Sequence, residues 1–170
     1  VDAMKNENGR RITRLEAVIE AAKRFTRGRP HDRLGLVFFG SRQMLSSPLT
    51  GAHQTIIENL DRTRAIQERI WAGSGGREGL LGNGTNLGLG LGAALAALNE
   101  DDSLGQAIVL ITDGRDLREF EGWVDPLEAA RHAKSLNTRV YAIGVGDRDG
   151  DHIVHTPFGG KRLEPVPPRL

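Results

Sequence analysis

Two turns of the sequence carry oxygen-bearing side chains that could hold a metal ion. Thr85 follows Gly84 in "GNGTNLG", and Asp113 stands between the strand-like run "VLIT" and Gly114. Hydroxyl and carboxylate oxygens are the hard ligands that Mg²⁺ prefers. A threonine before a helix also fits an N-cap, and an aspartate before glycine also fits a turn. The pair is therefore a candidate cation site, with a cap and a turn as the alternatives.

Other residues with reactive or metal-binding side chains form less specific patterns. The chain has no cysteine, which excludes thiolate catalysis, disulfides and cysteine-based metal sites. Neither a G-x-x-x-x-G-K-[ST] phosphate loop nor a G-x-S-x-G nucleophile turn occurs. A calcium loop starting at Asp147 in "GDRDGD" would need glycine and glutamate where the chain has His152 and Phe158. We interpret this segment, and the nearby His155, as part of a surface loop.

The composition is that of a folded domain without an electrostatic preference for nucleic acid. The 170 residues are 38% hydrophobic and 26% charged, with a formal net charge of +1. Lysines and arginines are scattered, which argues against a nucleic-acid partner. The longest uncharged apolar tract, 87–98, is shorter than the ~20 residues of a membrane-spanning helix, so no span is predicted within this chain. The length suits one domain over 1–170.

Hydrophobic periodicity predicts helices alternating with strands. Apolar residues recur at steps of three and four in four segments, 12–27, 51–70, 85–98 and 125–136. The last of these begins with Asp125 and Pro126, an N-cap residue and a residue suited to the first helical position. Continuous apolar runs predict strands at 33–40, 106–112 and 139–146, and we expect 42–47 to return as a hairpin strand. The tail 147–170 is rich in proline and glycine and is predicted to be irregular.

This alternation predicts an α/β domain with a doubly wound, mainly parallel sheet and helices on both faces. Ligands of such folds bind outside the carboxyl ends of the strands. Asp113 directly follows a predicted strand and is expected at this edge. The glycines of "LGLGLG" (88 and 90) lie inside a predicted helix, where small residues favour close packing on a sheet over nucleotide binding.

The ordered set of segments resembles a von Willebrand factor type A domain. The stretches that carry the resemblance cover most of 12–146 and are "RITRLEAVIEAAKRF", "DRLGLVFFGS", "SPLTGAHQTI", "GNGTNLGLGLGAALAAL", "AIVLITDGRD" and "DPLEAARHAKSLNTRVYAIGVG". "DRLGLVFFGS", "SPLT" and the tail "GVGDRDGDHIVHTPFGGKRLEP" are most similar to bacterial Bat-type, aerotolerance-associated members. The genes of that branch accompany MoxR-type ATPases, and its members are often membrane-anchored with this domain outside the cytoplasm.

In this family the carboxyl edge of the sheet holds a metal-ion-dependent adhesion site. The resemblance implies that Thr85 is the ligand from the second loop and Asp113 the ligand from the third, often through water. The implied ion is Mg²⁺, with Mn²⁺ or Ca²⁺ as alternatives. Gly84 and Gly114 would let the backbone turn beside the ligands. Because the last coordination position takes a carboxylate of a partner protein, the implied function is protein binding without catalysis.

The chain departs from the family pattern at both ends. The D-x-S-x-S motif that supplies further ligands, and the apolar strand before it, have no counterpart ahead of "VDAMKNENGRR". The last helix of the family has no counterpart after "PVPPRL". The first strand would lie in the middle of the sheet, between the strands predicted at 33–40 and 106–112. We therefore expect the sequence to be a fragment that holds part of the metal site.

Three functions stay open from the sequence. In a protein-binding module, Phe120 and Trp123 after Asp113 are expected either to contact the partner or to cover the core. A magnesium-dependent enzyme for phosphotransfer or nucleotide binding is the second function, but no lysine lies between Lys23 and Lys134 to serve it. The third is a metal-free scaffold that works through an ATPase partner, which likeness of fold does not separate from adhesion.

Overall fold

The computed structural model describes residues 3–5, 11–75, 79–82, 84–99, 105–112, 122–145, 151–155 and 161–165. Within them lie the helices α1 (Arg14–Arg27), α2 (His53–Gly73), α3 (Leu87–Asn99) and α4 (Pro126–Ser135). The strands are β1 (Ala3–Lys5), β2 (Arg11–Thr13), β3 (Leu34–Phe39), β4 (Gln43–Thr50), β5 (Ala107–Thr112), β6 (Arg139–Gly144), β7 (Asp151–His155) and β8 (Lys161–Pro165). Helices therefore alternate with strands through the middle of the chain, as predicted.

The start of α1 is set by a capping box. The Thr13 hydroxyl accepts a hydrogen bond from Glu16 N at 3.1 Å, and Glu16 Oε2 accepts one from Thr13 N at 2.7 Å. These two bonds satisfy amide groups that a helix end leaves unpaired. The helix therefore begins at Arg14, later than the periodicity from Ile12 predicts, and the residues before it form β2.

The sheet consists of separate strand pairs. β3 and β4 pair antiparallel, and β5 and β6 run parallel from Ala107 opposite Arg139 to Thr112 opposite Gly144. β4 extends three residues beyond the predicted 42–47 hairpin strand, through Pro48 to Thr50. Within the described ranges no strand joins β3 to β5 by hydrogen bonds. The doubly wound, mainly parallel sheet predicted from the sequence is thus confirmed only in part.

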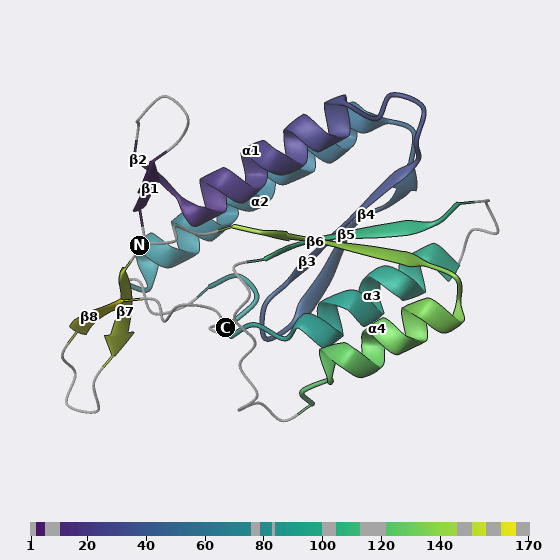
Figure 1. The fold of residues 1–170 in the computed structure, drawn as a ribbon. Coiled ribbons are helices and arrows are strands. Elements are labelled where there is room, and N and C mark those ends of the chain that lie inside the picture. Colours follow the sequence, from purple (N-terminus) through teal and green to yellow (C-terminus); the bar gives the residue numbers. More distant parts are fainter. Residues whose placement is uncertain are drawn as a thin grey trace.

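Helices cover both sides of the strands, as predicted. In Figure 1, α1 and α2 lie on one side of the strands, and α3 and α4 lie on the other. The first side is built on Ile19, Ile56 and Leu60, against which Leu36 and Phe38 of β3 pack. On the second side the buried residues are Leu91, Leu95, Ile108, Ala129 and Ala133, with Val140 of β6 packed against them.

Two parts of the chain differ from the predictions. The strand at 139–146 reads as buried on both faces, but in β6 Tyr141 is 52% exposed and Ile143 is 42% exposed. Their neighbour Val140 points to the opposite face, toward α3 and α4, because successive side chains of a strand alternate. The tail, predicted to be irregular, contains β7 and β8, which pair antiparallel from Asp151–Pro165 to His155–Lys161. β-Branched residues at 153 and 154 favour such a strand.

Candidate functional site

Three segments meet where β3 ends and where α3 and α4 begin. They are the β3–β4 turn (40–42), the segment before α3 (79–82 and 84–86) and the segment before α4 (122–125). Gly40 N donates to Arg42 O at 2.7 Å, and Arg42 N donates to Leu81 O at 3.1 Å. A Cβ atom added to Gly40 would lie 2.8 Å from Leu81 O, so the close approach requires glycine. The first two segments are therefore fixed to each other.

Thr85 lies between two anchored backbone amides. Gly84 N donates to Ser41 Oγ at 2.8 Å, and Asn86 N donates to Gly40 O at 2.9 Å. Thr85 itself is half-buried. The predicted ligand thus belongs to a short stretch that is held on both sides by the turn following β3.

Asn86 is the N-cap of α3. Its Oδ1 accepts from Leu89 N at 3.0 Å, and its backbone carbonyl accepts from Gly90 N at 3.1 Å. The alternative in which Thr85 is a plain helix cap is therefore wrong, because the capping position belongs to the next residue.

The same asparagine links this stretch to the segment before α4. Asn86 is 1% exposed, its Nδ2 donates to Gly122 O at 3.3 Å, and its Oδ1 accepts a second bond from Val124 N at 3.4 Å. Sequence reasoning did not single out Asn86. Thr85 and Asn86 are both favourable capping types, and only the partners 36 and 38 residues away distinguish them.

Small residues let α3 approach the edge, as predicted for "LGLGLG". A Cβ atom added to Gly88 would overlap the carbonyl oxygen of Val124. The helix therefore lies directly against the segment to which Asn86 is hydrogen-bonded. This contact supports close packing as the role of the glycine and not nucleotide binding.

The remaining predicted site residues are covered only in part. β5 ends at Thr112, so the chain leaves this strand toward Asp113 at its carboxyl end. Asp113, Gly114 and Phe120 lie outside the described residues, and their roles stay predictions. Trp123 is half-buried next to Gly122, the acceptor of the bond from Asn86.

Trp71 is an aromatic residue near this edge that the sequence analysis missed. It lies in the last turn of α2 and is 38% exposed. One turn earlier, Gln67 Oε1 accepts from Leu80 N at 2.7 Å, which joins the end of α2 to the segment before α3. Periodicity over 51–70 does not single out Trp71, because the residue follows the predicted helix and lies beyond the buried residues of α2.

The oxygen-bearing side chains of the predicted site are of the type that a hard cation binds. In the segments that the structure describes, no group of three or more His, Cys, Asp or Glu side chains could hold a metal ion. The predicted site depends instead on hydroxyl and carboxylate oxygens, which suit Mg²⁺. Of these donors Thr85 is described, and α3 does not use its hydroxyl for capping.

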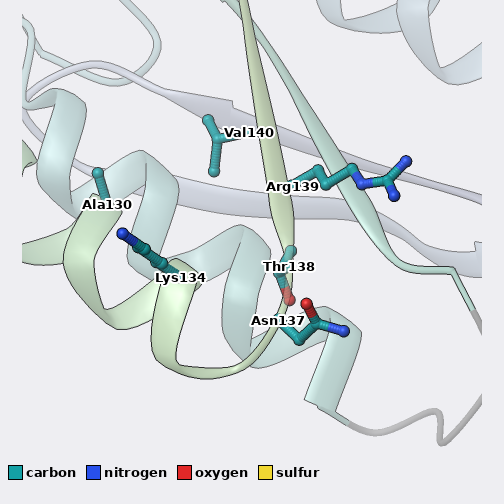
Figure 2. Close-up of a pocket in the computed structure, with 6 residues that line it drawn as sticks. All are labelled: Ala130, Lys134, Asn137, Thr138, Arg139 and Val140. Carbon is teal, nitrogen blue, oxygen red and sulfur yellow. The ribbon is translucent and has the colours of Figure 1, made fainter.

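An open pocket of about 260 Å³ lies at the other end of α4, where the chain turns into β6. Thr138 in its wall is 5% exposed, and its hydroxyl has no hydrogen-bond partner. Figure 2 shows the Lys134 and Arg139 side chains extending to opposite sides of the strand. The C-terminal carbonyls of a helix also disfavour an anion. Because the Lys134 and Arg139 side chains do not converge, this pocket lacks the paired positive charges of an anion site.

In the described part of the chain, no helix combines the length and the apolar character needed to cross a membrane.

The sequence is similar to known proteins. The family profile of the von Willebrand factor type A domain matches residues 2–115. An uncharacterized protein of Borreliella burgdorferi is 30% identical over 136 residues, which are 80% of this chain and 35% of that protein. The chain thus spans about a third of the length of this relative.

Solved structures share the fold. An aerotolerance-related membrane protein from Bacteroides fragilis gives a TM-score of 0.69 at 21% identity, over 89% of this chain and 70% of that chain. BatB from Bacteroides thetaiotaomicron gives 0.68 at 20% identity, over 90% and 70%. Proximal thread matrix protein 1 from the mussel byssus, with a zinc-occupied MIDAS motif, gives 0.57 at 18% identity, over 79% and 33%. At these identities the likeness concerns the fold alone.

Proposed function

Because the chain belongs to the von Willebrand factor type A domain family, we propose that it is a protein-binding module with a divalent cation at the carboxyl edge of its strands. Thr85 and Asp113 supply oxygen ligands to this cation, and the partner supplies a carboxylate. The preferred ion is Mg²⁺, with Mn²⁺ or Ca²⁺ as alternatives. The partner is a protein with an exposed acidic side chain, and a MoxR-type ATPase is the candidate class.

The observation that carries this proposal is the position of the α3 cap. Asn86 makes the capping bond to Leu89 N, so capping of α3 does not require the hydroxyl of Thr85. The bonds of Gly84 to Ser41 and of Asn86 to Gly40 hold the backbone on either side of that hydroxyl. A ligand held in this way loses little conformational freedom when it binds an ion.

A bound hard cation supplies a charged centre that accepts oxygen ligands and keeps positions open for water or a partner. The protein side chains orient that centre and exclude competing ligands. One desolvated carboxylate contact can dominate the affinity of an interface, while the surrounding loops set specificity. Phe120 and Trp123 are the proposed aromatic contacts beside it, since aromatic residues are enriched in such interfaces.

Metal titration tests the proposal. Mg²⁺ binding to the full chain is measured by isothermal titration calorimetry for the wild type, Thr85→Ala and Asp113→Ala, and we expect each substitution to weaken binding at least tenfold. Thr55→Ala and Asp32→Asn are matched controls, because both residues are exposed and Asp32 follows α1, away from the capped start of α3. Equal Mg²⁺ affinity for the wild type and both site variants would rule out the proposed ligands.

The same proteins separate the competing functions. Release of phosphate from nucleotides or phosphoesters in the presence of Mg²⁺, lost in Asp113→Ala, would assign the chain to the enzyme class instead. A wild type that binds an ATPase partner but no Mg²⁺, with Thr85→Ala binding equally well, would assign the metal-free scaffold.

A further inference from the structure

The side chain of Asn86 does more than cap a helix. A cap needs one acceptor for the amide of Leu89, and serine, threonine or aspartate supplies that as well as asparagine. Asn86 also donates from Nδ2 to Gly122 O at 3.3 Å. Aspartate cannot reproduce this bond because an ionised carboxylate has no donor, and serine cannot because its single short hydroxyl would have to serve every partner. The three hydrogen bonds together use both ends of a primary amide. The choice of asparagine is thus explained by the link between two loops, and not by the cap.

The link is buried. Asn86 is 1% exposed, in the same class as the core residues Ile19 and Leu60. A buried amide group that loses its hydrogen-bond partner is destabilising, because it has also lost its contact with water. The protein therefore holds this asparagine in one arrangement, with Oδ1 toward Leu89 N and Val124 N and with Nδ2 toward Gly122 O.

The link also lies beside the proposed ligand. Thr85 is the residue directly before Asn86, and Gly122 is the residue at which the described chain resumes after Thr112. One side chain therefore joins the backbone next to Thr85 to the segment before α4. Ser41 and Gly40 hold the other side of the same stretch.

We infer that Asn86 is the positioning residue of the cation site: its amide fixes the Thr85 stretch against Gly122 and Val124, so that the Thr85 ligand is held in place before an ion binds. The inference rests on the proposed function. Asn86 acts through Thr85 and the segment before α4 and is not itself a ligand. Residues that orient metal ligands in this way typically change metal affinity 10- to 100-fold when replaced.

The test replaces Asn86 by another capping residue in the full chain. Asn86→Ser keeps an acceptor for Leu89 N but is too short to hold Gly122 and Val124. We expect its Mg²⁺ affinity, measured by calorimetry, to fall at least tenfold. In the metal-free protein, hydrogen exchange followed by NMR is expected to speed up at the Val124 amide and to stay unchanged at the Leu89 amide. Asn86→Thr repeats the test with a second capping residue if the serine variant does not fold.

Thr13→Ala is the matched control, because it removes the cap of another helix, α1, and none of the hydrogen bonds of Asn86. It is expected to lower stability and to leave Mg²⁺ affinity at the wild-type value. Wild-type Mg²⁺ affinity in Asn86→Ser, together with a loss of stability like that of Thr13→Ala, would reduce Asn86 to a structural cap. If the wild type binds no Mg²⁺, the proposed function and this inference both fail. If the wild type binds Mg²⁺ and Asn86→Ser binds it equally well, only this inference fails, so the two failures are distinguishable.

Discussion

Gly90 of α3 lies directly against the ring of Phe39 at the end of β3: a Cβ atom added to the glycine would be 2.5 Å from Cγ of the ring. The contact brings the helix axis close to the strand and sets the depth at which α3 packs. Two positions of the same helix differ sharply in this respect, because a Cβ atom added to Gly92 would meet no atom within 4 Å. The glycines of one short segment therefore have different physical roles.

Gly90→Ala is expected to destabilise the protein, and Gly92→Ala is expected to stabilise it slightly. A methyl group at 90 must displace the Phe39 ring, and such overpacking typically costs about 1–3 kcal/mol. A methyl group at 92 meets open space and removes backbone freedom from the unfolded chain, which typically gains about 0.4–1 kcal/mol. Urea denaturation of the two variants measures both effects. Equal stability of the two variants would contradict the packing shown here.

Lys23 and Asp61 join α1 to α2 by an ion pair, and the partners are expected to respond unequally to substitution. Lys23 Nζ lies 2.5 Å from Asp61 Oδ1 and 3.6 Å from Glu20 Oε1, and the lysine is 8% exposed. Asp61→Asn leaves the buried ammonium with its weaker partner, which should cost about 1–3 kcal/mol of unfolding free energy. Lys23→Met removes the charge at similar volume and should cost less than about 1.5 kcal/mol.

The control for this pair is Glu20→Gln. The Glu20 side chain is 59% exposed, so its ion pair with Lys23 should contribute less than about 1 kcal/mol. Chemical denaturation of the variants ranks the contributions. A larger loss of unfolding free energy in Glu20→Gln than in Asp61→Asn would show that Glu20, and not Asp61, is the main partner of the Lys23 ammonium.

Asp125 caps α4 and is expected to be replaceable by serine but not by alanine. Its Oδ1 accepts from Leu127 N at 2.8 Å, and Pro126 follows in the first turn. Asp125→Ala should lower the unfolding free energy by about 1 kcal/mol, while Asp125→Ser should retain most of it. Thermal denaturation monitored by circular dichroism compares the two. Matching melting temperatures for these variants would show that the cap contributes nothing.

The two tryptophans of the chain are expected to report differently on cation binding. Trp123 follows Gly122, which Asn86 holds, whereas Trp71 lies in the last turn of α2. In Trp71→Phe, added Mg²⁺ should change the fluorescence of the remaining Trp123. In Trp123→Phe, the remaining Trp71 should respond less. If only Trp71 responded to Mg²⁺, the ion would bind nearer the end of α2 than we propose.

The sequence predicts the helices and strands of this fold better than it predicts how deeply their side chains are buried. Asp125 followed by Pro126 locates the start of α4, because capping and fixed backbone geometry act within a few residues. Ile66 is placed on the buried side of its helix by periodicity but is 37% exposed. Periodicity identifies the apolar stripe of a helix, but it does not say how far the neighbouring elements extend along it.

In the candidate site, too, the sequence predicts local features but not those that depend on distant parts of the chain. Thr85 and the turn before α3 could be found from residue types, since hydroxyls and glycines at a helix start are a local pattern. Asn86 could not, because its role depends on Gly122 and Val124, which only the folded chain brings to it. The choice between two adjacent capping residues is a long-range question, and local sequence contains no answer to it.

α3 is in contact with β3 and β4 on one side of the described chain and with β5 and α4 on the other. The two strand pairs are not hydrogen-bonded to each other within the described residues, and α3 packs on both of them. Local unfolding of either strand pair would therefore expose apolar surface of α3. A partner that binds the stretch before α3 would contact the start of the helix that packs on both strand pairs. Force applied there should test whether the two strand pairs unfold together.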